Sequence, residues 1–347
     1  MPVWSTRNLM RLAALLLVPL LTRCNAGAEP GQIPTVRARW EQRAPMPESR
    51  TEVSVATDGE LIYVIGGFKR ESGETASAPR AVFVYDPARD QWTSPDSIPE
   101  GVNHAGLVHL DGKLYIVGGY RENTFDPTGA VHIYDLATRR WSEGAPMPTP
   151  RGAMGVTVLG GKIHAIGGTV ADPTGLEPHL HGTAAGNSVG THEVYDPATD
   201  TWSRRAPMPT ARNHLGAASL GGKIYALAGR VPGNATLTAN EVYDPGTDRW
   251  ATAAPVPTGR SGVAVVALGE YVYIFGGETF GAVSKTFDEA ERYRAASGRW
   301  ESLPRMPTAR HGLGAAAVGG AIYVISGGPQ PGFAFSGANE RLVPAGG

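Results

Sequence analysis

The sequence predicts an all-β protein, a β-propeller of six four-stranded antiparallel blades. Three recurring features predict this fold. Beyond the first 28 residues a tryptophan occurs six times, an apolar run ending in small residues also occurs six times, and a tyrosine stands seven residues before each of the last five tryptophans. Four short strands that repeat at intervals of about 50 residues are typical of propeller blades.

The four strands of the repeat can be assigned in order. The first is rich in small residues, as in 312–318, which suits the crowded centre of a ring of wedge-shaped blades. The second is a continuous apolar run bounded by glycines, which fits a strand covered on both faces. The third carries the tyrosine and the fourth the tryptophan, whose large rings fill the widening gap between blades. The second strands are expected at 61–67, 113–119, 162–168, 223–229, 271–277 and 321–327, and the fourth strands at Trp40, Trp92, Trp141, Trp202, Trp250 and Trp300.

The sixth repeat is incomplete, and the N-terminal segment carries the part that it lacks. Its third strand, 339–344, has Leu342 in the tyrosine position, and no tryptophan follows. Trp40, in contrast, marks a fourth strand that has no first, second and third strands before it. We therefore predict that the segment around Trp40 is the fourth strand of the last blade and closes the ring. The propeller then spans 40–344, and 29–39 is a linker.

Residues 1–28 have the pattern of a secretory signal peptide. Two arginines precede a short apolar run at 12–21, and small residues follow at a position suited to cleavage. The only cysteine, Cys24, ends a stretch that resembles a bacterial lipobox, although Arg23 departs from that pattern. Two outcomes therefore stay open, cleavage after residue 28 or lipidation of Cys24. We expect an exported protein, periplasmic or extracellular, held at a membrane only if Cys24 is lipidated.

The composition limits the classes of partner. Lysine and arginine total 31 against 32 aspartate and glutamate residues, so neither nucleic acid nor an anionic membrane is expected as the main partner. The 46 glycines and 28 prolines suit many tight turns between short strands. We expect a monomer that needs no cofactor and no metal.

The double glycine, the tyrosine and the tryptophan at fixed distances resemble kelch repeats. The match covers 40–344, with Ala228 and Ser326 each replacing the first glycine of a pair. The resemblance implies a ligand surface on the face that carries the loops from fourth to first strand and from second to third strand. It implies a binding scaffold for a glycan or a protein. The alternative is a sugar mutarotase or epimerase, by distant similarity to the exported sialic acid enzyme, with a rim histidine or carboxylate acting beside Arg230. The copper chemistry of galactose oxidase is excluded, because it needs a cysteine cross-linked to a tyrosine and the only cysteine, Cys24, lies in the signal region.

Five arginines occupy equivalent positions where the chain enters the first strand, and two roles are open for them. They could ring the mouth of the propeller and bind carboxylates or phosphates. They could instead pair within each blade with the glutamates of the third strand, since a buried charge needs a partner. The second blade lacks both members, with Val102 and His132, which favours the structural role. The arginines are Arg50, Arg151, Arg212, Arg260 and Arg310, and the glutamates are Glu193, Glu241, Glu291 and Glu340.

Residues that break the repeat are better candidates for a binding site. Some follow the arginine position, and others follow the double glycine, so we expect them around one rim. Aromatic, amide, imidazole and guanidinium groups around a concave mouth suit a sugar or a peptide, and the alternative is an idle solvated rim. The candidates are Asn103, His104, Tyr120, Asn213, His214, Arg230, Glu278 and His311.

The third blade has a long loop, 169–191, about ten residues longer than its neighbours. It contains Asp172, Glu177, His179 and His181. An H-x-H pair with carboxylates could bind a metal, but ligand spacing in a loop is unconstrained. We expect a lid over the mouth or a plain surface loop instead.

Overall fold

The computed structural model describes residues 33–70, 75–171 and 187–344. These ranges contain strands and turns but no helix. Accordingly, none of the described residues forms a helix that is long and apolar enough to span a membrane.

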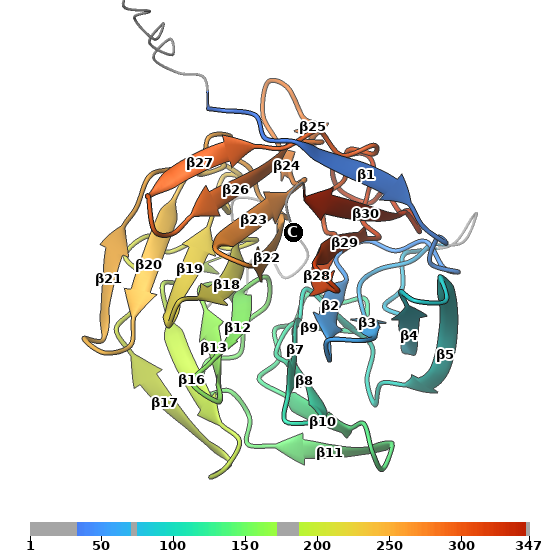
Figure 1. The fold of residues 1–347 in the computed structure, drawn as a ribbon. Coiled ribbons are helices and arrows are strands. Elements are labelled where there is room, and N and C mark those ends of the chain that lie inside the picture. The colour runs from blue at the N-terminus through green and yellow to red at the C-terminus, as the bar shows by residue number, and fades with distance from the viewer. Residues whose placement is uncertain (1–32, 71–74, 172–186, 345–347) are drawn as a thin grey trace, which may run out of the picture. The chain divides into compact units, whose positions relative to one another are not determined.

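Six four-stranded antiparallel sheets form the blades of a ring, as predicted (Figure 1). The first three blades are β2 (Ser54–Thr57), β3 (Ile62–Ile65), β4 (Ala81–Asp86) and β5 (Gln91–Ser97) for blade I; β7 (Gly106–Leu110), β8 (Lys113–Val117), β10 (Val131–Asp135) and β11 (Arg140–Gly144) for blade II; and β12 (Gly155–Leu159), β13 (Lys162–Ile166), β16 (His192–Asp196) and β17 (Thr201–Arg205) for blade III. The others are β18 (Gly216–Leu220), β19 (Lys223–Leu227), β20 (Asn240–Asp244) and β21 (Arg249–Thr252) for blade IV; β22 (Ala264–Leu268), β23 (Tyr271–Phe275), β26 (Ala290–Arg294) and β27 (Arg299–Ser302) for blade V; and β28 (Gly314–Val318), β29 (Ala321–Ile325), β30 (Asn339–Pro344) and β1 (Ala38–Gln42) for blade VI.

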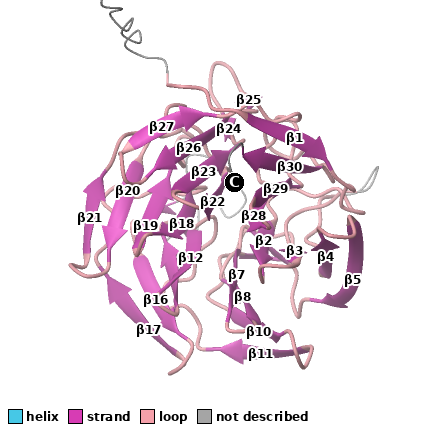
Figure 2. Cartoon of the chain, in the orientation of Figure 1, coloured by secondary structure: helices cyan, strands magenta, loops and turns pink. Residues whose placement is uncertain are grey.

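Three small two-stranded sheets lie in the loops between these strands. Figure 2 labels the strands of one of them, β24 and β25. They pair β6 (Val102–Asn103) with β9 (Tyr120–Arg121), β14 (Thr169–Val170) with β15 (Asn187–Ser188), and β24 (Glu278–Thr279) with β25 (Lys285–Thr286). The sheets β14–β15 and β24–β25 follow the second strands of blades III and V, whereas in β6–β9 strand β6 precedes the first strand of blade II and β9 follows its second strand. The sheets β6–β9 and β24–β25 include Asn103, Tyr120 and Glu278, so they fix the backbone around candidate site residues.

The predicted ring closure is confirmed. Strand β1 pairs antiparallel with β30 and places Trp40 opposite Leu342. The strand begins at Ala38, two residues before the predicted start of the propeller, because the ladder continues to Pro344. Even Thr35, within the predicted linker, forms a bridge to Ser302 of blade V. The first and last parts of the described chain therefore share one sheet (Figure 1).

Small residues fill the centre of the ring and aromatic residues fill its outer part. Gly314 begins β28, and a Cβ atom there would clash with the Val55 side chain of the next blade. Farther out, the Tyr134 ring lies 4.7 Å from that of Trp141 in the same blade. Five of the six fourth-strand tryptophans also donate an indole hydrogen bond to a backbone carbonyl in the segment that follows the fourth strand of the preceding blade. Trp202, for example, donates to Ala145 at 2.7 Å. The recurring tryptophans thus tie successive blades together.

Blade III departs from the repeat with a buried histidine pair, which should make the protein sensitive to acid. His164 occupies the position that is tyrosine in the other five blades, and its Nδ1 lies 2.9 Å from Nε2 of His192. Burial lowers the pKa of His164 to about 4. Burial and then the neighbouring His164 lower the pKa of His192 to about 3.

Both folded-state pKa values lie below the usual histidine value of about 6.5, so the unfolded chain takes up these protons first. The pair therefore contributes its full stability above about pH 6.5, and this is lost as the pH falls towards 4 and then 3. We expect the urea midpoint to fall less between pH 7 and pH 4 in the double variant H164Y/H192V, whose residues blade I carries at these positions. An identical pH dependence in both proteins would show that the pair is not responsible.

Candidate functional site

Each blade contributes one residue to a ring around the central axis. This residue stands two positions after the one that is arginine in five blades and Val102 in blade II. All six have a positive φ, between 51° and 64°. Backbone hydrogen bonds join neighbours in the ring, for example from His214 N to Ala153 O at 2.8 Å and from Gly262 N to His214 O at 2.9 Å. We call this set the axial ring. Its members are Glu52, His104, Ala153, His214, Gly262 and Gly312.

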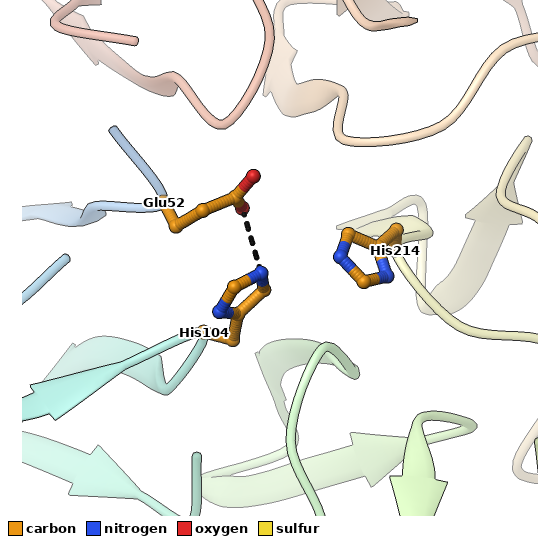
Figure 3. A group of neighbouring side chains, drawn as sticks. All are labelled: Glu52, His104 and His214. Atoms are coloured by element: carbon orange, nitrogen blue, oxygen red, sulfur yellow. Dashed lines mark ion pairs between the residues drawn. The ribbon is translucent and has the colours of Figure 1, made fainter. Parts of the chain in front are cut away.

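The left-handed backbone is costly for residues other than glycine, by roughly 1 to 2 kcal/mol each. Gly312 must be glycine, because a Cβ atom there would lie 2.7 Å from the backbone nitrogen of Glu52. Glu52, His104 and His214 instead carry large side chains in this strained conformation (Figure 3). Strained residues of this kind cluster at functional sites, so the three side chains mark the axis as the place to look for one.

The two axial histidines are oriented by the asparagines that precede them. Nδ1 of His104 lies 2.7 Å from Oδ1 of Asn103, and Nδ1 of His214 lies 2.6 Å from Oδ1 of Asn213. Both amide nitrogens donate elsewhere, to a backbone carbonyl and to a serine hydroxyl, which identifies each Oδ1 as an acceptor. The hydrogen-bond network therefore assigns the proton to Nδ1 and leaves the lone pair on Nε2.

A second set of polar groups lies beside the axial ring. His311 Nδ1 donates to the Gly328 carbonyl at 3.1 Å, and its Nε2 lies 3.5 Å from Oε2 of Glu278. Arg230 donates from Nη1 to Oε1 of Glu278 at 2.8 Å and from Nη2 towards Nε2 of His214 at 2.9 Å. These contacts join Arg230 and Glu278 to His311 and to one of the two axial histidines, His214.

Burial controls the charge of this cluster. It lowers the pKa of His104, an effect that the Glu52 carboxylate opposes. It also lowers the pKa of His214 well below the usual value, and the Arg230 guanidinium adds to that shift. Burial raises the pKa of Tyr120 to about 12. At neutral pH the two axial imidazoles are therefore neutral and the tyrosine keeps its proton.

A cavity of about 210 Å³ lies above these groups, with a polar floor and phenylalanine walls. The Phe68 ring lies 5.5 Å from that of Phe125 and 5.3 Å from that of Phe333. Phe280 lies over the Arg230 guanidinium, at 5.3 Å. A second cavity of about 100 Å³ also has Glu52, His104 and His214 in its lining. The axial side chains therefore separate two spaces along the propeller axis, and we call the larger one the axial mouth.

The structure brings together most of the residues proposed from the sequence. His104, Tyr120, His214, Arg230, Glu278 and His311 line the axial mouth. Asn103 and Asn213 are buried behind it and hold the histidines. Sequence reasoning missed Glu52, although it stands two residues after Arg50 as His214 stands after Arg212. Phe68, which directly follows a double glycine, was expected at the rim, but Phe125, Phe280 and Phe333 were missed because they have no fixed place in the repeat. Asp172, Glu177, His179 and His181 lie outside the described residues.

The five equivalent arginines lie away from the mouth. All are fully buried, and none lines the cavity. Arg151 shows why, because its Nε and Nη2 donate to the Gly167 and Ala165 carbonyls of its own blade, both at 2.9 Å. The guanidinium is thereby held inside the blade and cannot ring the mouth. The ion pairs are Arg151–Glu193, Arg212–Glu241, Arg260–Glu291 and Arg310–Glu340, and Arg50 pairs with Glu48.

Comparison with known proteins gives matches along most of the chain. Residues 34–204 match the model of the KLHDC2/KLHL20/DRC7 Kelch-repeats domain, and 211–257 and 259–307 match the Kelch motif. Kelch-like protein 36 of Rattus norvegicus is 28% identical over 196 residues, 56% of this chain and 30% of that protein. Kelch-like protein terF of Aspergillus terreus is 35% identical over 98 residues, 27% of this chain and 21% of that protein. Beta-scruin of Limulus polyphemus is 38% identical over 81 residues, 23% of this chain and 8% of that protein. Each alignment covers less than a third of the relative's own length.

Proposed function

The chain belongs to the kelch-repeat β-propeller family, and from this premise we propose that it is an exported binding scaffold that takes one residue-sized group of a protein partner into the axial mouth. The kelch repeats themselves indicate a propeller scaffold of the protein-binding kind. The finer statement, that binding occurs at the mouth, depends on the side chains gathered there.

The observation that carries the proposal is the exposed apolar surface on the mouth face. Among the described residues, the exposed large apolar side chains are Val283, 72% exposed, and Phe333, 50% exposed. Both lie in loops that follow the second strand of a blade, on the same face as the mouth. Phe333 continues inward through Phe68 to the cavity. Exposed aromatic surface that leads into a pocket is typical of a protein-binding site.

The size and polarity of the mouth define the group that it can take. A cavity of about 210 Å³ is smaller than the usual pocket for a drug-sized ligand, so it fits a single side chain. Its floor offers the carboxylates of Glu52 and Glu278 and the guanidinium of Arg230. An aromatic wall that excludes water from a polar floor is the arrangement of a binding hot spot.

A sugar ring is the other occupant of this size, because it can stack on phenylalanine and bond to the same polar groups. The enzymatic alternative, a sugar mutarotase or epimerase, has no support from the relatives that the chain matches. We therefore keep the glycan as an outcome of the binding test and do not carry the enzyme forward.

The test is parallel selection of ligands on the purified full chain from a displayed peptide library and from a glycan array. We expect an enriched peptide whose affinity, measured by calorimetry, falls at least about tenfold in Phe333→Ala. Lys223→Ala, in the hairpin at the opposite end of blade IV, is the control and should bind as the wild type does. An enriched glycan with the same dependence on Phe333 would replace the protein partner. A ligand insensitive to Phe333→Ala, or none from either library, would refute binding at the mouth.

Export is tested separately. The secreted or membrane-associated chain should have the mass of a product that begins after residue 28, or at a lipid-modified Cys24. An unprocessed chain that stays in the cytoplasm would contradict export.

A further inference from the structure

Beyond this proposed function, and independently of any protein partner, we propose that the axial ring is a binding site for a divalent transition-metal ion, held by the carboxylate of Glu52 and by Nε2 of His104 and of His214. The ligand atoms of these three residues all lie within 4.8 Å of one another. Figure 3 shows the three side chains reaching the axis from three different blades.

The first argument is that hydrogen-bond acceptors face one another across the axis. His104 uses its Nδ1 hydrogen on Asn103, so its Nε2 presents a lone pair to Oε2 of Glu52 at 3.2 Å. His311 uses its Nδ1 hydrogen on a backbone carbonyl, and its Nε2 lies 3.6 Å from Oε1 of Glu52. Two acceptors at these distances repel unless a cation lies between them. A divalent metal ion between Nε2 of His104 and the Glu52 carboxylate would remove this repulsion.

The second argument is the support behind the ligands. A histidine that binds a metal almost always donates its other N–H to an oxygen, which fixes the ring and the tautomer. Asn103 and Asn213 supply that oxygen in the same way for the two axial histidines. The Asn-His pair occurs at this slot only in blades II and IV. The repeat alone does not require these side chains, since Gly262 and Gly312 fill the slot in blades V and VI.

The third argument is charge and ligand type. Arg230 and Glu278 neutralise each other, and among the described residues Glu52 has ion-pair distances only to His104 and His311, not to a lysine or an arginine. Two imidazoles and one carboxylate suit the metals from Mn²⁺ to Zn²⁺ rather than Mg²⁺ or Ca²⁺, which prefer oxygen alone. Three protein ligands leave further coordination positions on the ion, and the axial mouth is one of the two cavities that border these ligands. The ion would then present a positive charge to an oxygen of whatever enters the mouth.

Binding requires small movements. Bonds from the ion to nitrogen or oxygen are about 2.0 to 2.2 Å long, so ligand atoms up to 4.8 Å apart must close in slightly. His214 must also give up the contact from Arg230 Nη2, while Nη1 of that arginine stays on Glu278. A second group of Glu52, Glu278 and His311 lies within the same 4.8 Å limit. It supplies a carboxylate and an imidazole on the other side of Glu52, which can complete the coordination.

The test is a zinc titration of the metal-free full chain against a chromogenic chelator, in a Cys24→Ser background because a free thiolate would itself bind zinc. We expect one tight site per chain. Affinity should fall at least about 100-fold in Glu52→Gln and in His104→Gly, and by about 10- to 100-fold in Asn103→Ala, which only positions its histidine. His109→Ala, on β7 away from the mouth, is the matched control and should bind as the parent does.

The two ligand variants protect the test against misfolding. Glu52→Gln keeps the size of the side chain, and His104→Gly places glycine where φ is already positive, so both should keep the unfolding midpoint of the parent. The absorption of bound Co²⁺ should change in His104→Gly, because one of the two nitrogen ligands is lost there. No binding at micromolar zinc, or binding unchanged in both ligand variants, would overturn the proposal.

Discussion

Removing residues 33–43 should abolish the cooperative folded state of the propeller. The deletion removes β1, the ladder from Ala38 to Gln42 and the Trp40 ring, which packs edge-on to Phe275 at 5.8 Å. Truncating a single buried aromatic residue to alanine costs about 3 to 5 kcal/mol. The total stability of a protein is about 5 to 15 kcal/mol, so loss of a whole closing strand is comparable with the total. The freed edge of β30 would also promote association between chains.

This outcome is measured by urea unfolding followed by circular dichroism, and by size-exclusion chromatography. A chain that begins at Ile33 is the control and should unfold in one sharp transition as a monomer. A synthetic peptide of residues 33–43, added to the truncated chain, should restore part of the transition. A monomeric truncated chain that unfolds as sharply as the control would show that blade VI does not need β1.

Replacing Arg151 by methionine should lower the free energy of unfolding by about 3 to 5 kcal/mol. Arg151 and Glu193 both have fully buried side chains. The variant leaves the buried glutamate with only the 3.7 Å contact to the exposed Arg204 and a hydrogen bond from Thr149. Removing one partner of a buried pair in this way is much more costly than losing the pair as a whole. Desolvation already lowers the pKa of Arg151, and only the contact with Glu193 opposes that shift.

The double variant R151M/E193M separates the pair from its surroundings. It should be less destabilised than the sum of the two single variants, because no charge is left unpaired. Arg140→Met, at an exposed position in β11, should change the stability by less than about 0.5 kcal/mol. Equal losses at Arg151 and Arg140, in chemical unfolding, would contradict a buried structural pair.

The fold could be predicted from the sequence because each blade repeats the same physical solution. The fourth-strand tryptophan contacts the preceding blade, and the small residues of the first strand fit the crowded centre. Both features recur in the sequence at nearly constant spacing. Ring closure was predictable for the same reason, since Trp40 supplies what the repeat at Leu342 lacks. The start of β1 at Ala38 was not, because strand ends depend on the local ladder with Pro344 rather than on the repeat.

The site could be predicted only in part. His104 and His214 could be recognised as departures from the repeat. Glu52 was not recognised, because it follows Arg50, which fits the repeat and was considered only for its pairing with a glutamate. The contacts of Phe68 with Phe125 and Phe333 join loops of three blades. No periodic pattern encodes such contacts, since they depend on how each variable loop folds back over the mouth.

The central claim is that Glu52, His104 and His214 converge on the axis as one site that holds a cation. Anomalous diffraction from crystals equilibrated with zinc, collected above the zinc edge, tests it most directly. We predict the strongest anomalous peak on the propeller axis, about 2.0 to 2.2 Å from a Glu52 oxygen and from Nε2 of both histidines. A map with zinc peaks only elsewhere, and with the acceptor atoms still 3.2 Å apart across an empty axis, would contradict the claim.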